Sequence, residues 1–153
     1  NAFKFFSRAA ERGEMFAQYN LGTYYEGGKG LPAPDYTNAF RWYKQSADKG
    51  FNTAQNAIGR FYEKGLGHAV DEEMAFKYYM KAAEQGNKET VYKLASYNIG
   101  RMYENGIGVE HDLRLAGIWY RRSSAQGFDL AKRQLALEKF SRVRMARAGW
   151  CWD

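Results

Sequence analysis

Hydrophobic and polar positions along this chain follow one pattern that occurs four times. Two adjacent aromatic residues are followed four positions later by small residues and then by a glycine. The string FKYYMKAAEQG at 76–86 returns as FRWYKQSADKG at 40–50 and FKFFSRAAERG at 3–13, with IWYRRSSAQG at 118–127 as a fourth copy. A period of this length over most of a chain predicts stacked supersecondary units.

A second apolar pattern lies between these strings and has the three-to-four spacing of one helical face. Its members are Ala17, Leu21 and Tyr25, then Ala54, Ile58 and Tyr62, then Ala95, Ile99 and Tyr103. Each of these helices carries a glycine in register: Gly22, Gly59 and Gly100. Because glycine inside a helix costs about 1 kcal/mol relative to alanine, the sequence predicts that the backbone of a partner helix approaches closely at these three positions.

Glycine-rich loops follow these first helices, with GGKGLPAP at 27–34, GLG at 65–67 and GIG at 106–108. Glycine adopts left-handed backbone angles at a helix C-terminus without steric penalty. Each loop leads to an aspartate, Asp35, Asp71 or Asp112. Aspartate at this place is predicted to cap the N-terminus of a second helix. The second helix carries the aromatic pairs, and only a neighbouring hairpin can cover them.

These signals divide the chain into hairpin units. We expect the second helix of a truncated repeat at 1–13, full repeats at 14–50, 51–86 and 87–127, and a C-terminal capping helix with a basic tail at 128–153. The third repeat has a short insertion around Lys88-Glu89-Thr90-Val91-Tyr92, expected as an added turn of its first helix. Because Asn1 falls inside a helical pattern, we expect further repeats before it.

The combined pattern resembles the Sel1-like repeat, a subclass of the tetratricopeptide-like solenoids. The motif reads A-x-x-x-[LI]-G-x-x-Y-x-x-G-x-G and then D-x-x-x-A-x-x-[WY]-Y-x-x-[AS]-A-x-x-G, over roughly residues 1–140. The resemblance implies an all-α, right-handed α/α superhelical solenoid and a non-enzymatic scaffold or adaptor that works in larger complexes. Some cysteine-rich members are linked to β-lactam binding or hydrolysis, but they need paired cysteines in the repeats, which this chain lacks.

A groove for a partner protein or peptide is predicted on the first helices. Residues two positions beyond the core residues lie about 200° around the helix and face the hollow of the superhelix. Amide, tyrosine and arginine side chains suit a peptide backbone and a carboxylate. The predicted groove residues are Tyr19, Thr23, Asn56, Arg60, Glu63, Tyr97, Arg101 and Glu104, with Glu26 and Lys64 beside them. The alternative is a solvated polar face in which Arg60 or Lys64 pairs with Glu63.

The net charge of +6 adds a second function to consider. Residues 128–153 hold six basic groups against three acidic ones, whereas the repeats are close to balanced. RNA binding through this basic surface is therefore the alternative to peptide binding, and it predicts an affinity that falls steeply with salt. The basic end could equally touch an anionic membrane. The aromatic end, Trp150-Cys151-Trp152, either covers the last repeat or makes an external contact.

Catalytic, cofactor and metal sites are not predicted. His68 and His111 have no second ligand at metal spacing, and Cys151 has no evident base partner. The GGKG string at 27–30 lacks the spacing of a phosphate-binding loop. No run of residues approaches the roughly 18 apolar positions of a spanning helix. The lone cysteine favours a reducing compartment such as the cytoplasm, while the helical start leaves export or a periplasmic location open.

Overall fold

The computed structural model describes residues 2–84, 90–137 and 139–140, and the regular structure of these residues is helical. The elements in chain order are α1 (Ala2–Glu11), α2 (Met15–Gly27), α3 (Tyr36–Asp48), α4 (Asn52–Lys64), α5 (Glu72–Glu84), α6 (Thr90–Asn105), α7 (Leu113–Ala125) and α8 (Asp129–Leu135). The predicted all-α class is confirmed.

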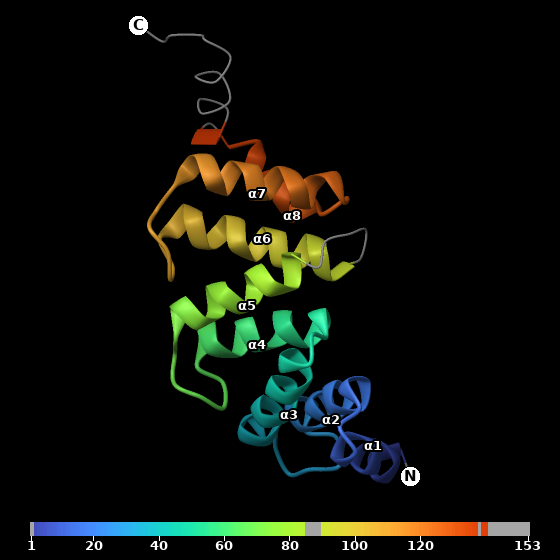
Figure 1. Cartoon of the computed structure of the whole chain (residues 1–153). Coiled ribbons are helices and arrows are strands. Elements are labelled where there is room, and N and C mark those ends of the chain that lie inside the picture. Colours follow the sequence, from blue (N-terminus) through green and yellow to red (C-terminus); the bar gives the residue numbers. More distant parts are fainter. Residues whose placement is uncertain (1, 85–89, 138, 141–153) are drawn as a thin grey trace, which may run out of the picture.

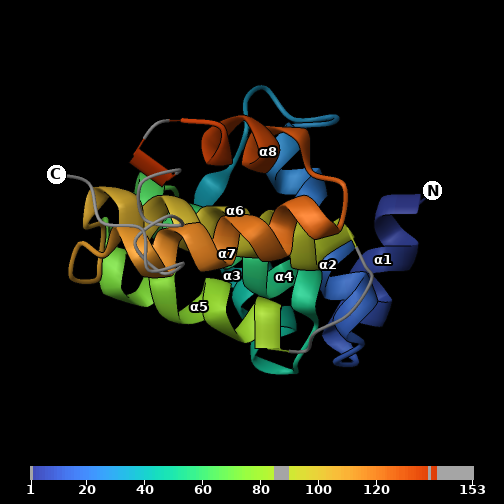
Figure 2. The same ribbon diagram turned by 90° about the horizontal axis from the view of Figure 1, so that it is seen from above.

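The helices form a stack of antiparallel hairpins. Each helix packs against the next one in the chain, and α4 also contacts α6. Figure 1 shows the stack rising in chain order from α1 to α7, with α8 at the level of α7, and Figure 2, seen from above, shows α8 to one side of α7. We call α2–α3 the first unit, α4–α5 the second and α6–α7 the third. Stacked hairpins of this kind make a solenoid, as predicted.

The second helices begin at the predicted aspartate caps. The carboxylate Oδ1 atom of each aspartate accepts a hydrogen bond from the backbone N–H three residues later. These bonds join Asp35 to Asn38 at 3.0 Å, Asp71 to Met74 at 3.0 Å and Asp112 to Leu115 at 2.9 Å. Such a cap typically stabilises a helix by about 1 kcal/mol, so the start of each second helix is fixed locally.

The glycine loops have a second role besides ending the first helices. Gly65 ends α4 in the left-handed conformation, with a φ of 69°, as the sequence predicts. Two residues later, a Cβ atom on Gly67 would lie 2.1 Å from the carbonyl oxygen of Tyr36, in the preceding unit. A Cβ atom on Gly108 would lie 2.2 Å from the carbonyl oxygen of Glu72. The loops of the second and third units therefore pack on the start of the preceding second helix.

The helix glycines lie against tyrosine rings. A Cβ atom added to Gly59 would stand 2.7 Å from two ring carbons of Tyr79, a separation that real Cβ atoms do not show. The same contact joins Gly22 to Tyr43 and Gly100 to Tyr120. Close approach at these glycines is thus confirmed, but the predicted backbone contact is wrong, because the nearest atoms belong to aromatic side chains.

These tyrosines form the centre of the core. Tyr43, Tyr79 and Tyr120 are each at most 1% exposed. The small residues that follow them, such as Ala47 and Ala82, are also buried. The predicted alternation of large and small side chains between stacked helices is therefore present.

The ends of the third unit depart from the pattern. Helix α6 has 16 residues where α2 and α4 have 13, so the expected added turn is confirmed for Thr90, Val91 and Tyr92. Lys88, Glu89 and the closing Gly86 lie outside the described residues. The basic tail at 141–153 and its Trp150-Cys151-Trp152 end also lie outside them.

We expect Gly59→Ala to lower the free energy of unfolding by about 1–3 kcal/mol, because the new methyl group must displace the buried ring of Tyr79. Gly27→Ala is the matched control, since its Cβ atom would meet nothing closer than 3.9 Å. Urea unfolding of both variants measures the difference. Equal stability of the two variants would contradict the ring contact as the reason for the glycine.

Candidate functional site on the first helices

The eight predicted groove residues all lie on the first helices α2, α4 and α6, and all are half-buried. The positions repeat from unit to unit. Tyr19, Asn56 and Tyr97 occupy one equivalent position, and Thr23, Arg60 and Arg101 occupy another, directly after the helix glycine. The glutamates Glu26, Glu63 and Glu104 stand near the ends of these helices.

Each glutamate is the centre of a polar cluster that joins two units. In the first glutamate cluster (Glu26, Tyr43 and Arg60), the hydroxyl of Tyr43 donates to Oε2 of Glu26 at 2.6 Å. Arg60, which comes from the next unit, places Nη1 2.7 Å from Oε1 of the same carboxylate. One carboxylate therefore binds the second helix of its own unit and the first helix of the following unit.

The second glutamate cluster (Glu63, Tyr79 and Arg101) repeats this arrangement with a two-bond ion pair. Tyr79 donates to Oε2 of Glu63 at 3.0 Å. The guanidinium of Arg101 contacts both carboxylate oxygens, Oε1 at 2.6 Å and Oε2 at 2.8 Å. The Glu63 side chain is only 13% exposed. Paired contacts of this kind are the stronger form of arginine–carboxylate interaction.

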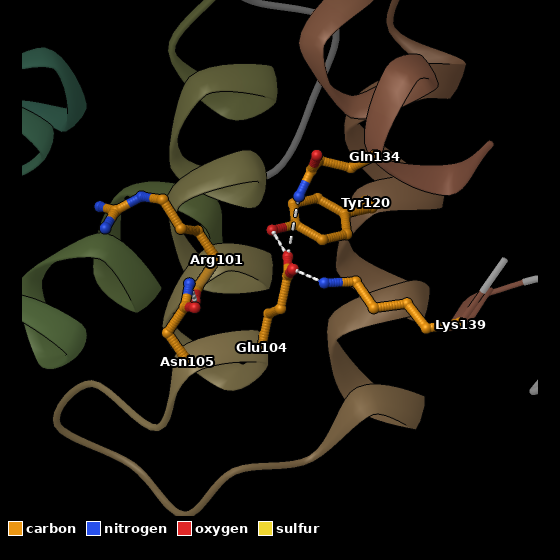
Figure 3. Close-up of polar contacts among 6 residues, drawn as sticks. All are labelled: Arg101, Glu104, Asn105, Tyr120, Gln134 and Lys139. Atoms are coloured by element: carbon orange, nitrogen blue, oxygen red, sulfur yellow. Dashed lines mark hydrogen bonds and ion pairs between the residues drawn. The ribbon is translucent and has the colours of Figure 1, made fainter. Parts of the chain in front are cut away.

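The third glutamate cluster (Glu104, Tyr120, Gln134 and Lys139) replaces the arginine with residues from the C-terminal segment (Figure 3). Tyr120 donates to Oε2 of Glu104 at 2.5 Å, and Nε2 of Gln134 donates to the same oxygen at 3.0 Å. The ammonium of Lys139 contacts Oε1. Arg101, also drawn in Figure 3, points away from Glu104, in accord with its bonds to Glu63.

The clusters lower the pKa of their glutamates. Burial alone raises the pKa of the Glu63 carboxyl, but the hydrogen bond and charge of Arg101 and the Tyr79 hydroxyl outweigh it, so the pKa falls below its ordinary value. The pKa values of Glu26 and Glu104 fall in the same way. Burial, together with the neighbouring glutamate, raises the pKa of Tyr79. The three cluster glutamates are therefore kept as charged carboxylates, and the cluster tyrosines are kept as neutral phenols.

The two tyrosines among the predicted groove residues, Tyr19 and Tyr97, are fixed by aromatic packing. The ring of Tyr19 lies 5.4 Å from Tyr43 and 5.3 Å from Phe51, measured between centroids. Tyr97 lies at 5.6 Å from Tyr120 and 5.1 Å from Phe128. Both rings thus join a hairpin to the start of the following first helix.

At each of the two repeated positions of the first helices, one unit carries a different residue type: Asn56 at the tyrosine position and Thr23 at the arginine position. Asn56 replaces the tyrosine in the second unit, and its buried Oδ1 atom has no hydrogen-bond partner among the described residues. Thr23 replaces the arginine in the first unit, and its hydroxyl donates to the carbonyl oxygen of Asn20 at 2.6 Å.

The structure brings Arg60, Glu63, Arg101 and Glu104 into contacts within the chain. The alternative pairing of Arg60 with Glu63 is wrong, because Arg60 pairs with Glu26 and Glu63 pairs with Arg101. Besides Gln134 and Lys139, the cluster members Tyr43, Tyr79 and Tyr120 were not predicted as site residues. Their signal is in the sequence, since the second residue of the aromatic pair is tyrosine in every full unit and a glutamate follows the Tyr25, Tyr62 and Tyr103 series.

No metal centre or membrane span emerges from the described residues. They contain no group of three or more histidine, cysteine, aspartate or glutamate side chains placed to hold a metal ion. None of the helices formed by these residues combines the length and apolarity required to cross a bilayer.

Comparison with known proteins shows which family has this architecture. The family model described as Sel1 repeat matches residues 1–14, 16–51, 52–87 and 93–128. The chain belongs to the Sel1 repeat family. Proteins of this family are generally protein–protein interaction scaffolds and are typically non-enzymatic. A search of curated proteins finds no match to this Sel1-repeat chain.

Three solved structures are similar to it. A Sel1 repeat protein from Oxalobacter formigenes is 37% identical, with a TM-score of 0.73, and the match covers 86% of this chain and 95% of that one. The protective antigen c5321 of uropathogenic Escherichia coli is 35% identical, with a TM-score of 0.80 over 88% of this chain and 28% of the antigen. Helicobacter pylori cysteine rich protein B, at 20% identity and a TM-score of 0.64 over 88% of this chain and 92% of its own, shares the fold.

We expect Glu63→Gln to lower the free energy of unfolding at pH 7 by about 1.5–3 kcal/mol, the usual contribution of a hydrogen bond to a charged group. Because the folded pKa of Glu63 lies below the unfolded value of about 4.3, the stabilisation is complete above the unfolded pKa. It is lost as the pH falls through the folded pKa. Urea unfolding at pH 7 and toward about pH 3 should show the two proteins converging.

Glu110→Gln is the control for this pH series, because Glu110 is an exposed loop residue. The free energy of unfolding of Glu110→Gln should equal that of the original protein at every pH of the series. A Glu63→Gln deficit that stays constant with pH would show that the carboxylate charge is not responsible.

Proposed function

We propose that this Sel1-repeat chain is a non-enzymatic scaffold that holds a partner peptide or protein against the first-helix face. The observation that carries the proposal is the hydrogen-bonding capacity of Arg60 that its contacts with the described residues do not use. Its ion pair with Glu26 is made through Nη1, and the side chain is 35% exposed. A guanidinium has five N–H donors, so donors remain for the carbonyl or carboxylate oxygens of a partner.

The neighbouring groups suit the same task. Asn56 offers an amide with one acceptor and two donors, and buried polar atoms such as its Oδ1 are normally satisfied by a protein, water or ligand group. Tyr19 and Tyr97 are held in place by ring packing. Side chains that are already ordered lose little entropy on binding, which favours a stable complex.

We assign roles to the eight residues on this basis. Tyr19, Asn56 and Tyr97 hydrogen-bond the backbone of an extended segment, and Thr23 flanks them. Arg60 and Arg101 bind its carboxylates, while Glu63 and Glu104 hold their clusters in place. The contact between α4 and α6 supports a curve with the first helices on its inner side, which would make this face the concave one.

The test must separate binding from folding. Arg60→Ala or Arg101→Ala would also remove an ion pair between units. The combination Tyr19→Phe, Asn56→Ala and Tyr97→Phe removes polar groups while keeping both ring contacts. We expect it to weaken binding at least about tenfold, since each lost hydrogen bond contributes about 0.5–1.5 kcal/mol.

The partner for this measurement is obtained by photocrosslinking in cell extract, with a benzophenone side chain at Thr23. The same group at Thr37, which is exposed on α3, is the control for the other face. The purified partner is then titrated with original and triple-variant protein, after thermal melts have shown equal stability. A partner that crosslinks equally at both positions, or an unchanged affinity, would contradict the proposal. A nucleic acid bound with steep salt dependence would favour the RNA alternative.

A further inference from the structure

An exposed aromatic cluster lies where the first-helix face begins. The ring of Phe16, in the first turn of α2, is 61% exposed. It packs edge-on against Phe51 at the start of α4, with 4.8 Å between ring centroids, and Phe51 packs in turn on Tyr19 at 5.3 Å. We call Phe16, Tyr19 and Phe51 the aromatic cluster. Contacts within the chain cover less than half of the Phe16 surface.

The repeat itself does not require an aromatic ring at this position. Phe16 comes directly before the core residue Ala17, and the residue directly before the equivalent Ala54 is Thr53. A threonine therefore serves for packing in the second unit. Aromatic side chains are enriched at the buried centres of protein interfaces. An exposed ring that is joined to two further rings thus suits the apolar side chain of a partner.

The aromatic cluster is continuous with the polar part of the same face. Burial and the charge of Glu26 raise the pKa of Tyr19, and the charge of Arg60 opposes them. The phenol of Tyr19 and the guanidinium of Arg60 therefore lie within electrostatic reach of each other. Asn56 precedes Arg60 by about one helical turn on α4. Aromatic rings, an amide and a guanidinium thus follow one another along this face.

The polar end of the face has a surplus of positive charge. Arg60 lies 2.7 Å from the carboxylate of Glu26, and Arg101 makes two bonds to Glu63, so each of these carboxylates has its own arginine. Lys64, exposed in the last turn of α4, is an additional cation. Its charge joins that of the closer Arg60 in lowering the pKa of Glu26 against the effect of burial. This surplus favours a carboxylate on the partner.

The distance between the two ends determines how the partner's side chains must be spaced. Phe51 and Arg60 are nine residues apart along α4, which corresponds to about 13–14 Å at a rise of about 1.5 Å per residue. An extended chain advances about 3.3–3.4 Å per residue and places every second side chain on the same side. Two side chains four residues apart therefore point in one direction and match this distance.

We propose that the first-helix face binds an extended segment of a partner protein in which an apolar side chain and an aspartate or glutamate stand four residues apart. The apolar side chain covers Phe16 and Phe51, the backbone between the two residues meets the amide of Asn56, and the carboxylate binds Arg60 and Lys64. This inference rests on the proposed function and adds the chemistry and spacing by which the partner is recognised.

A display library of random peptides of about twelve residues tests the spacing on the whole chain. The peptides are displayed within a carrier protein, so that every carboxylate comes from a side chain. Among selected peptides, an apolar residue four positions from an aspartate or glutamate should be at least about fivefold more frequent than in the unselected library. A preferred spacing of seven or eight residues, as a helical peptide would give, or no preferred spacing, would overturn the proposal.

Phe16→Thr tests the apolar end, because threonine is the natural residue at the equivalent position of the second unit. It should weaken the binding of a selected peptide at least about fivefold, since the apolar contact is lost. Phe5→Thr is the matched control, because Phe5 is 70% exposed but lies on α1, and it should leave the affinity unchanged. Thermal melts first confirm that both variants are folded. An equal effect of the two variants, or none of Phe16→Thr, would contradict the aromatic cluster as the apolar subsite.

Lys64→Gln tests the charged end without breaking the ion pair of Arg60. A fresh selection on this variant should enrich acidic residues at least about threefold less than selection on the original protein. Lys77→Gln is the control, because Lys77 is exposed on α5, and it should retain the full enrichment. An acidic preference that survives in Lys64→Gln would overturn the assignment of the carboxylate to this end.

The selected peptides also distinguish this inference from the proposed function. If the combination Tyr19→Phe, Asn56→Ala and Tyr97→Phe weakens their binding and Phe16→Thr does not, the face binds a partner of different chemistry and only this inference is wrong. If the triple variant binds them as the original protein does, or if no peptide is enriched, both fail.

Discussion

Each hairpin of this Sel1-repeat chain is closed by a tyrosine ring of the second helix that lies against a glycine of the first. The ring occupies the space that a Cβ atom would need, so the two helices pack at a distance that no other residue type at the glycine allows. The same tyrosine carries its hydroxyl through the core to the glutamate of its unit. Apolar packing and the polar clusters are therefore parts of one contact, and each glutamate is presented to the next unit because the ring has fixed it.

This dependence changes how the polar face of the first helices should be interpreted. A glutamate that is shared between a tyrosine and an arginine of the next unit cannot be exchanged for a ligand group without cost to the array. Arg101 makes two bonds to Glu63, whereas Arg60 makes one ion pair with Glu26 and its side chain is 35% exposed. The positions that vary between units, Thr23, Asn56 and the tyrosines Tyr19 and Tyr97, lie outside the glutamate clusters, so the closure of the hairpin does not depend on them.

How far the sequence predicts this structure depends on the range of each interaction. The aspartate caps and glycine loops are local, so Asp35, Asp71 and Asp112 could be assigned from spacing alone. The sequence also indicates that Gly59 must be small. It does not indicate which atoms pack against Gly59, because a helix glycine can face either backbone or a side chain. The pairing of Arg60 with Glu26 was out of reach, since it depends on how two units stack. Sequence reasoning instead offered the local pair with Glu63, which lies three residues away on the same helix.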